Sequence, residues 1–316
     1  MTSKAQELQI MDSNTKKNLQ QHNLHLPVML AEAMNYLNIN PGMAIVDCTV
    51  GTGGHAEAIL ERLQSKGRLI AIDRDKESLT IAQNRLERFG ALTTFIHNDF
   101  RNLNNILDNL KIHSVDGIFF DLGLSSYQLE SPERGFSIKA DAPLDMRMDR
   151  TSYISAYDLV NFLSEKEISS ILKNFGQERW HNRIARWLIK ERSRHPISST
   201  AELSTIVLKS IPYQKGYWRI HPATRTFQAF RIAVNRELES LQESLDKAVG
   251  LLKKGGRICV ISFHSLEDRI AKHGFRKFAA EGIIKVLTPK PVMATQKEVS
   301  SNIRSRSAKM RAAEKL

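Results

Sequence analysis

Three glycines follow an acidic residue, Asp47, in the segment DCTVGTGGH, residues 47–55. Glycine has no Cβ atom, so the backbone can turn sharply there and approach a ligand closely. A helix that begins directly behind such a loop presents free backbone N–H groups to the ligand. This segment therefore predicts a ligand-binding loop, with Asp47, Gly51, Gly53 and Gly54 as candidate contacts.

A second carboxylate, Asp73, lies 19 residues after Gly54, at the end of an apolar run. It can accept hydrogen bonds from both hydroxyl groups of a ribose, which indicates a ligand that contains a nucleoside. The pattern GxGxxA that begins at Gly51 loosely fits a dinucleotide fingerprint, so a nicotinamide-dependent dehydrogenase stays open. Asp47 favours S-adenosylmethionine, because a carboxylate can pair with the ammonium group of the methionine moiety and would repel a pyrophosphate. A tight strand–helix turn without a ligand is the third interpretation.

Asp99 and Phe100 follow the next apolar run, in the segment NDF. An acidic and an aromatic side chain at the end of a strand can bracket an adenine ring, Asp99 by hydrogen bonding and Phe100 by packing. An ordinary strand-end turn can have the same sequence, so this pair supports a nucleoside ligand only together with the glycine loop.

The segment FDLGLSS, residues 120–126, ends a fourth apolar run. In open α/β sheets the chemistry takes place at the carboxyl ends of strands. The exocyclic amine of a nucleobase is a poor nucleophile, because its lone pair is conjugated with the ring. An enzyme must orient such an amine and accept its proton, and Asp121, Ser125 and Ser126 carry suitable acceptors. They are the candidate catalytic residues for methyl transfer to an amine, a reaction that also needs close in-line positioning.

The two cysteines, Cys48 and Cys259, both lie in apolar runs. Methylation at carbon 5 of a pyrimidine needs a thiolate nucleophile, and buried thiols are poor nucleophiles, so transfer to nitrogen or oxygen is favoured. Two buried thiols fit a reducing cytoplasm and exclude a cysteine-ligated zinc site, and we predict no metal site. There is neither a secretory signal pattern nor an apolar run of the ~20 residues that a membrane helix needs, so we expect a cytoplasmic protein.

Short apolar runs alternate with helical patterns from residue 44 onward. This alternation is typical of βαβ units and of a parallel sheet that helices cover on both faces. The predicted strands are residues 44–48, 68–73, 93–97, 116–123, 257–264 and 282–288, with a seventh near 309–313 that periodicity does not show.

Helical signals replace this alternation after residue 126. Two capping boxes, Ser164 with Glu167 and Ser199 with Glu202, precede apolar residues at helical spacing. A single long helix over 224–252, ended by the lysines and glycines of 253–256, then leads back to the sheet. The predicted division is a disordered extension (1–22), a ligand-binding domain (23–126 and 226–316) and an all-helical insertion (127–225).

The positive charge is unevenly distributed along the chain. The net charge is +12 overall, −2 for residues 1–126 and +6 for residues 284–316. A basic excess of this kind favours a polyanionic partner such as nucleic acid. Four arginines near the domain junctions can contact phosphates: Arg134, Arg147, Arg225 and Arg231. Three aromatic residues there can stack on a displaced base: Tyr127, Phe136 and Trp218. His264 can act as an acid or a base.

The longest motifs closely resemble the MraW family of bacterial small-subunit rRNA methyltransferases, from about residue 25 to residue 314. They are DCTVGTGGH, AIDRD, FFDLGLSS, ERGFS, PLDMRMD, FGQERW, HPATRTFQAFRI, GGRICVISFHSLEDR and RSRSAKMRAAEK. The resemblance implies a class I, Rossmann-like sheet of seven strands with an inserted all-helical domain. It also implies N4-methylation of a cytidine of 16S rRNA, at position 1402 in the conventional rRNA numbering, within the small ribosomal subunit.

Carried over residue by residue, the resemblance implies contacts to S-adenosylmethionine from Gly53, Gly54, His55, Asp73, Phe100, Asp121 and Gln128. Asp121 then has two candidate roles, donor binding and activation of the amine. A homodimer is compatible with the sequence. Two alternatives stay open beside the dehydrogenase: an amino-methyltransferase for another RNA or DNA site, and a non-catalytic RNA-binding or assembly factor.

Overall fold

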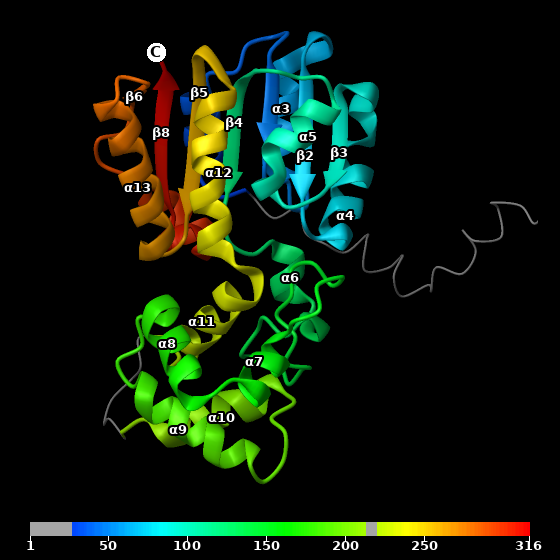
Figure 1. Ribbon diagram of the computed structural model, residues 1–316. Helices are drawn as coiled ribbons and strands as arrows, with labels where there is room; N and C mark the ends of the chain where they lie inside the picture. The colour runs from blue at the N-terminus through cyan, green and yellow to red at the C-terminus, as the bar shows by residue number, and fades with distance from the viewer. Residues whose placement is uncertain (1–26, 213–219) are drawn as a thin grey trace, which may run out of the picture.

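The computed structural model describes residues 27–212 and 220–316 (Figure 1). The predicted disorder of residues 1–22 and the predicted stacking by Trp218 lie outside these residues. The chain forms a sheet unit and a helical unit, and the arrowheads of β2 and β3 point toward the helical unit in Figure 1. The carboxyl ends of the parallel strands, where ligands bind in such sheets, therefore face the junction between the two units.

The sheet has the strand order β3-β2-β1-β4-β5-β8-β6, and β7 pairs only with β8. Neighbours from β3 to β5 are parallel, whereas β8 runs antiparallel to β5 and β6. The strands are β1 (Ala44–Asp47), β2 (Arg68–Asp73), β3 (Thr93–His97), β4 (Val115–Asp121), β5 (Leu252–Ser262), β6 (Ile284–Val286), β7 (Val292–Met293) and β8 (Lys309–Lys315). All seven predicted strands are present, and the predicted Rossmann-like methyltransferase sheet is confirmed; the two-residue β7 is an addition.

Helices cover both faces of this sheet, as the near-continuous apolar strands predict. One apolar cluster joins the sheet to α2, α3 and α4, and another joins it to α5, α12 and α13. These helices are α2 (Leu30–Leu37), α3 (Gly54–Leu63), α4 (Lys76–Leu86), α5 (Leu103–Asn109), α12 (Glu237–Leu251) and α13 (Ser265–Ala280). In the part of the chain that the structure describes, no helix is long and apolar enough to cross a membrane.

The single helix predicted over 224–252 is wrong in two respects. The chain forms α11 (Thr224–Asn235) and α12, separated by Arg236 in the left-handed conformation with φ 49°. At the break, the carbonyl of Asn235 accepts a hydrogen bond of 2.6 Å from Arg74, a partner that a continuous helix would exclude. The residues expected to end the helix, 253–256, instead belong to β5.

The helical unit packs five helices around an apolar core of its own. They are α7 (Ala156–Phe162), α8 (Glu165–Gly176), α9 (His181–Arg192), α10 (Thr200–Ser210) and α11. Both predicted capping boxes are present, at Ser164 and Ser199. The predicted domain boundary at residue 225/226 falls inside α11, whose buried side chains Phe227 and Phe230 pack in the helical core.

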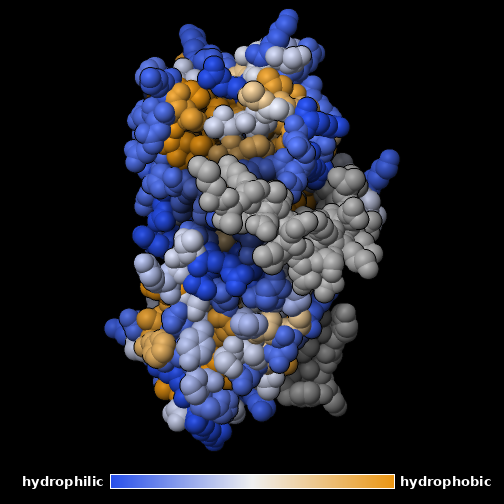
Figure 2. Space-filling view, turned by 90° about the vertical axis from the view of Figure 1, so that its right-hand side faces the viewer, coloured by the Kyte–Doolittle hydropathy of each residue, from blue (hydrophilic) through white to orange (hydrophobic). Residues whose placement is uncertain are grey.

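Short elements complete the junction and the edges of the sheet. Beside the site lie the helix α6 (Ser126–Glu130) and the 3₁₀ turns η4 (Phe100–Asn102), η5 (Pro132–Arg134) and η6 (Ile303–Ser307). Elsewhere are α14 (Gln296–Ser301), η2 (Gln64–Lys66) and η3 (Glu87–Leu92). On the face seen in Figure 2, strongly hydrophilic residues gather at the level where the two units meet.

Candidate active site

A cavity lies at the carboxyl ends of the parallel strands; we call it the first cavity. Six of the predicted site residues line it: Gly51, Asp73, Phe100, Asp121, Ser125 and Gln128. They come from the glycine loop, the ends of β2 and β4, η4 and α6. These six residues, which were predicted from the sequence, therefore lie together in the folded protein.

A second cavity adjoins the first, and both are lined by Gly51, Gly123, Leu124 and Ser125. Gly54, His55 and Ser126 line the second cavity and not the first. The remaining predicted contacts, Asp47, Gly53 and Asp99, line neither of the two.

The glycine loop is held against Asp73, whose carboxylate accepts hydrogen bonds from the backbone N–H groups of Gly51 at 2.7 Å and of Asp75 at 2.8 Å. Burial raises the pKa of Asp73 to about 6 against these two bonds, so the side chain is ionised at neutral pH. Gly53 has φ +87°, a conformation that disfavours any other residue. A Cβ atom on Gly54 would lie 2.7 Å from the ring of Pro27. These glycines thus meet backbone and packing requirements of the loop.

Asp47 is fully buried at the end of β1. One carboxylate oxygen accepts a 3.0 Å bond from the N–H of Thr49, and the other has no partner among the described residues. Burial raises the pKa of Asp47 to about 7. Since Asp47 lines neither cavity, its predicted pairing with a donor ammonium stays a prediction.

Asp121, which lines the first cavity, has one carboxylate oxygen without a partner among the described residues. Its Oδ2 atom lies 3.2 Å from Nδ1 of His55, whereas its buried Oδ1 atom has no hydrogen-bond partner in the described part of the chain. The other ring nitrogen of His55 lies 2.9 Å from the carbonyl oxygen of Val28. Burial acts to lower the pKa of His55, but the adjacent Asp121 outweighs it, and the pKa is raised. The contact with Asp121 thus stabilises the protonated form of His55.

The two predicted catalytic serines already have partners. The Ser125 hydroxyl accepts a 3.2 Å bond from the N–H of Gln128 and lies 3.2 Å from the hydroxyl of Ser78. The Ser126 hydroxyl accepts a hydrogen bond from Arg304. Of the three candidate catalytic residues, Asp121 alone has a buried acceptor atom without a partner among the described residues.

Asp99 points its carboxylate at two arginines. It forms ion pairs with Arg74 and, at 3.2 Å, with Arg101, and it caps η4. Phe100 lines the first cavity and packs edge-to-face on Phe120 with ring centroids 5.5 Å apart. The packing role predicted for Phe100 has a place in this geometry, whereas the predicted hydrogen bond from Asp99 to an adenine would compete with the two arginines.

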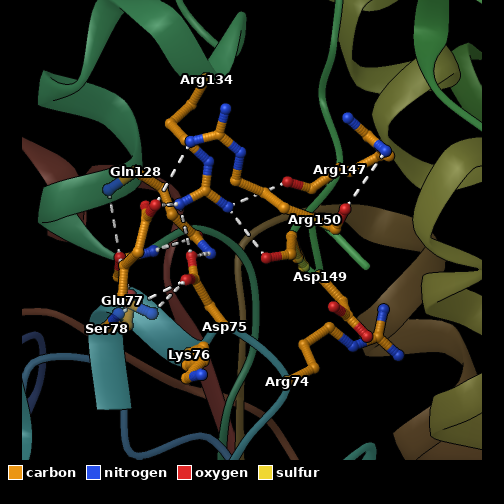
Figure 3. Close-up of polar contacts among 12 residues, drawn as sticks. Arg74, Asp75, Lys76, Glu77, Ser78, Gln128, Arg134, Arg147, Asp149 and Arg150 are labelled. Atoms are coloured by element: carbon orange, nitrogen blue, oxygen red, sulfur yellow. Dashed lines mark hydrogen bonds and ion pairs between the residues drawn. The ribbon is translucent and has the colours of Figure 1, made fainter. Parts of the chain in front are cut away.

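Gln128 belongs to a network centred on Asp75 (Figure 3). Its amide nitrogen donates to Asp75 at 2.6 Å, and Arg134 lies 2.9 Å from the same carboxylate oxygen. Arg134 also pairs with Glu77 at 2.7 Å, and only 1% of its surface is exposed. The phosphate contact predicted for Arg134 is therefore wrong, because burial and two carboxylates engage this guanidinium inside the protein.

Some of the other junction residues are engaged inside the protein, and others remain at least partly exposed. Arg147 forms a bidentate pair with Asp145, at 2.7 and 3.0 Å. Arg225 remains exposed. Phe136 is buried in the helical core, so the stacking predicted for it is wrong. Tyr127 is only partly buried, at the start of α6.

Arg231, Glu237, His264 and Glu267 form an ion-pair network beside the first cavity. Arg231 donates two bonds of 2.8 Å to Glu237, and His264 lies 3.2 Å from Glu267. Although burial acts to raise it, His264 and Arg231 hold the pKa of Glu267 below its usual value. Ligand atoms of Glu237, His264 and Glu267 lie within 4.8 Å of one another, but Arg231 engages both oxygens of Glu237 and balances that charge. His264 lines neither cavity, so its predicted role as an acid or base stays a prediction.

Comparison with known proteins identifies the family. The model of the MraW methylase family matches residues 22–316. The chain belongs to the MraW methylase family. A protein of Geotalea uraniireducens named ribosomal RNA small subunit methyltransferase H is 48% identical over 310 residues, which cover 92% of this chain and 98% of that relative. The protein of the same name from Caldicellulosiruptor saccharolyticus is 45% identical over 307 residues, covering 92% and 99%.

Family membership confirms that this MraW methylase is a methyltransferase that uses S-adenosylmethionine, and it excludes the dehydrogenase alternative. Sequence reasoning missed several residues of the methylase site. Arg74 and Met148 line the first cavity, and Arg304 and Phe263 line the second. Arg74 directly follows Asp73, which is a signal that could have been used. Arg304 and Phe263 are far from the glycine loop in sequence, and only the fold brings them to it.

Proposed function

We propose that this MraW methylase transfers a methyl group from S-adenosylmethionine to the exocyclic N4 atom of a cytidine in 16S rRNA. The names of its relatives support an rRNA of the small ribosomal subunit as the substrate. The observation that carries the reaction type is the buried, unpartnered Oδ1 of Asp121 in the first cavity. An amine that gives up a proton needs such an acceptor.

The residues of the first cavity fit the methyl donor. Its lining includes Asp73 and Asp121, together with Glu237 and Glu267, which pair with Arg231 and His264. Its one cationic side chain, Arg74, pairs with Asp99. S-adenosylmethionine has a sulfonium and an ammonium group, so this charge favours it, whereas the pyrophosphate of a dinucleotide would be repelled. When bound, it would supply an electrophilic methyl group.

The chain's own residues bind the donor, orient the reacting groups and accept the proton of the target amine. Asp73 is ionised at neutral pH and faces the cavity, where it can accept ribose hydroxyls. Phe100 offers a ring for the adenine to pack on. Leu122, Leu124 and Met148 give the cavity apolar walls that limit water near the reacting atoms. Asp121 then accepts an N–H of the target amine through Oδ1, while His55 holds Oδ2.

The test uses small ribosomal subunits from a strain that lacks this methyltransferase. The purified protein is incubated with them and with S-adenosylmethionine labelled in the methyl group, and the rRNA is digested to nucleosides. We expect the label in N4-methylcytidine of 16S rRNA. Label in 5-methylcytidine, in DNA or another RNA only, or in no nucleic acid would refute the proposal; the last result would favour a non-catalytic RNA-binding factor.

A further inference from the structure

One side of α9 carries cations and tryptophans that the proposed function does not use. They are Arg179, Trp180, Arg183, Arg186, Trp187 and Lys190, and we call them the basic face. Their side chains recur at spacings of three or four residues, which places them on one side of the helix. The opposite side is apolar, and Ile184, Ala185 and Leu188 are buried there in the helical core.

Most cations of the basic face are not neutralised by carboxylates. Arg179, Arg183 and Lys190 are exposed, and none of them has a carboxylate partner among the described residues. Arg186 lies 3.7 Å from Glu165, but both side chains are exposed, at 74% and 46%, so water screens this pair. The face thus offers its positive charge to an anionic partner along a helix that is about 18 Å long.

Each of the two tryptophans has a cation beside its ring. The guanidinium of Arg179 lies 5.0 Å from the ring centroid of Trp180, and the ammonium of Lys190 lies 5.4 Å from that of Trp187. Both rings are partly buried against the helical core, which fixes them while part of each stays exposed. Nucleobases stack on such rings, and neighbouring cations add to the attraction. An acidic protein segment would use the cations but would leave the rings without a comparable role.

The basic face begins at a pocket beside Trp180. Arg179 also lines this pocket, and the segment around the start of α11 adds His221 and Arg225. Among the described residues that line it, Glu178 has the only carboxylate, which is buried and accepts a 2.8 Å bond from the N–H of Trp180. The pocket can therefore take an unpaired base beside the ring of Trp180 and a phosphate between two exposed guanidinium groups.

The basic face is separate from the active site. In Figure 1, α9 lies beyond α8, on the side of the helical unit away from the sheet unit. Neither of the two cavities of the active site is lined by a residue of this face. A nucleic acid that reaches both places must therefore extend beyond the target nucleoside.

We propose that the basic face binds a single-stranded segment of the substrate rRNA outside the target cytidine. Its phosphates contact the cations of the face, and its bases stack on Trp180 and Trp187. The segment is single-stranded because the rings can reach only bases that are not paired. This assignment rests on the proposed function, which names the same rRNA as the substrate. The face holds the small subunit on the enzyme without touching the methyl donor.

The double variant Arg179→Gln/Arg183→Gln tests the charge of the face, and Arg62→Gln/Arg276→Gln is its matched control. Arg62 on α3 and Arg276 on α13 are exposed, line neither cavity and have no carboxylate partner in the described part of the chain. Both double variants lose the same charge. Urea unfolding of each, compared with the wild type, separates a loss of binding from a loss of folding.

We expect Arg179→Gln/Arg183→Gln to raise the Kd for small subunits about tenfold, because two phosphate contacts are lost. The slope of log Kd against log salt concentration should fall by about 1.4, which is about 0.7 for each contact with a single strand. At saturating subunits kcat should stay within about twofold of wild type, because the lost contacts serve binding only. The control variant should change the Kd by less than about twofold, since salt screens distant exposed charges.

Trp180→Leu and Trp180→Phe test the stacking, with a short oligocytidylate as the probe. Trp180→Leu should weaken binding of the probe about tenfold, whereas Trp180→Phe, which keeps a ring, should retain most of it. Equal losses in these two variants would overturn the stacking. An oligoglutamate of equal charge that binds more tightly than the probe would point to an acidic protein partner and would overturn the assignment.

The comparison of the two double variants decides the assignment independently of catalysis. Equal effects of Arg179→Gln/Arg183→Gln and Arg62→Gln/Arg276→Gln on the Kd for small subunits would overturn it. If the wild-type enzyme methylates no rRNA but only the first variant weakens binding to small subunits, the proposed function fails and the basic face stands as an RNA-binding surface.

Discussion

Asp121 and His55 act as one unit at the residue scale. A backbone carbonyl only accepts hydrogen bonds, so the His55 nitrogen that faces Val28 carries a proton. The raised pKa of His55 favours a second proton on the nitrogen that faces Asp121. His55 thus holds one oxygen of the carboxylate, and the other oxygen has no partner among the described residues.

Replacing this acceptor tests the catalytic role. We expect Asp121→Asn to lower the single-turnover methylation rate about 10²–10⁴-fold at saturating donor and subunits, the usual contribution of a positioned proton acceptor. Calorimetry with S-adenosylhomocysteine separates this loss from a loss of donor binding. Asp116→Asn is the control, because Asp116 lies on the same strand, pairs with Lys253 and lines neither cavity. A rate within about threefold of wild type for Asp121→Asn would refute the role.

The raised pKa of Asp47 predicts that the stability of the protein depends on pH. Its pKa is about 7 in the folded protein and 3.8 in the reference state, because burial disfavours the charged form against the pull of Thr49 and His55. Between these values the folded chain holds a proton that the unfolded chain has lost, so stability falls as the pH rises from about 4 to about 7. Asp47→Asn lacks this penalty and keeps the bond to Thr49.

The measurement is urea unfolding of the variant and the wild type without donor. Relative to wild type, Asp47→Asn should gain roughly 2 kcal/mol of unfolding free energy between about pH 5 and about pH 7.5. A difference between the two proteins that is the same at both pH values would contradict the raised pKa of Asp47.

At the element scale, the turn around Arg134 joins the helical unit to the donor site. Arg134 bridges Asp75 and Glu77 of the sheet unit, and it also donates hydrogen bonds of 2.9 Å to the carbonyls of Arg147 and Met148. Gly135 follows it with φ +69°. The turn therefore depends on a residue without a side chain directly beside a fully buried guanidinium.

Gly135→Ala should be far more costly than the matched change Gly282→Ala. A Cβ atom on Gly135 would lie 2.3 Å from the carbonyl oxygen of Pro143, whereas Gly282 has nearly the same φ, +70°, and no atom within 4 Å. Both variants lose about 1 kcal/mol from the left-handed conformation, and only the first also meets a backbone clash. We expect urea unfolding to show at least about 2 kcal/mol more destabilisation for Gly135→Ala; equal losses would contradict the close approach.

For the whole molecule, the two units meet at the carboxyl end of the sheet through charged contacts. Arg74, next to the donor cavity, donates to the carbonyl of Asn235 at the end of α11. Arg134 makes the second connection, through Asp75. A ligand in the first cavity therefore touches residues that hold both units, and its binding should stabilise the entire chain.

A thermal-shift measurement tests this coupling and the identity of the ligand. At about 100 times its Kd, S-adenosylhomocysteine should add about 2.7 kcal/mol to the unfolding free energy and raise Tm by several degrees in a single transition. NAD should leave Tm unchanged, because its pyrophosphate meets the carboxylates of the first cavity. Stabilisation by NAD alone would contradict the assignment of this cavity to the methyl donor.

What the sequence by itself determined about this protein is what depends on neighbours along the chain. Apolar runs placed six of the seven main strands, because burial on both sheet faces leaves a continuous apolar pattern, whereas the strand near residues 309–313 shows no such pattern. Capping boxes at Ser164 and Ser199 placed two helix starts, because a cap involves residues only three positions apart. The carboxyl ends of parallel strands meet at one edge, so Asp73 and Asp121 were correctly expected to lie together.

The tertiary structure alone decided which polar groups remain available. Asp99 and Arg134 are neutralised by partners from other elements, so their charges do not face a ligand in the way their positions in the motifs predicted. The helix break after Asn235 depends on Arg74, 161 residues away. Arg304 reaches the glycine loop only through the fold of the C-terminal segment. Hydrogen bonds and ion pairs between distant residues leave no periodicity in the sequence. The charge that lines each cavity therefore depends on the fold and cannot be predicted from the sequence.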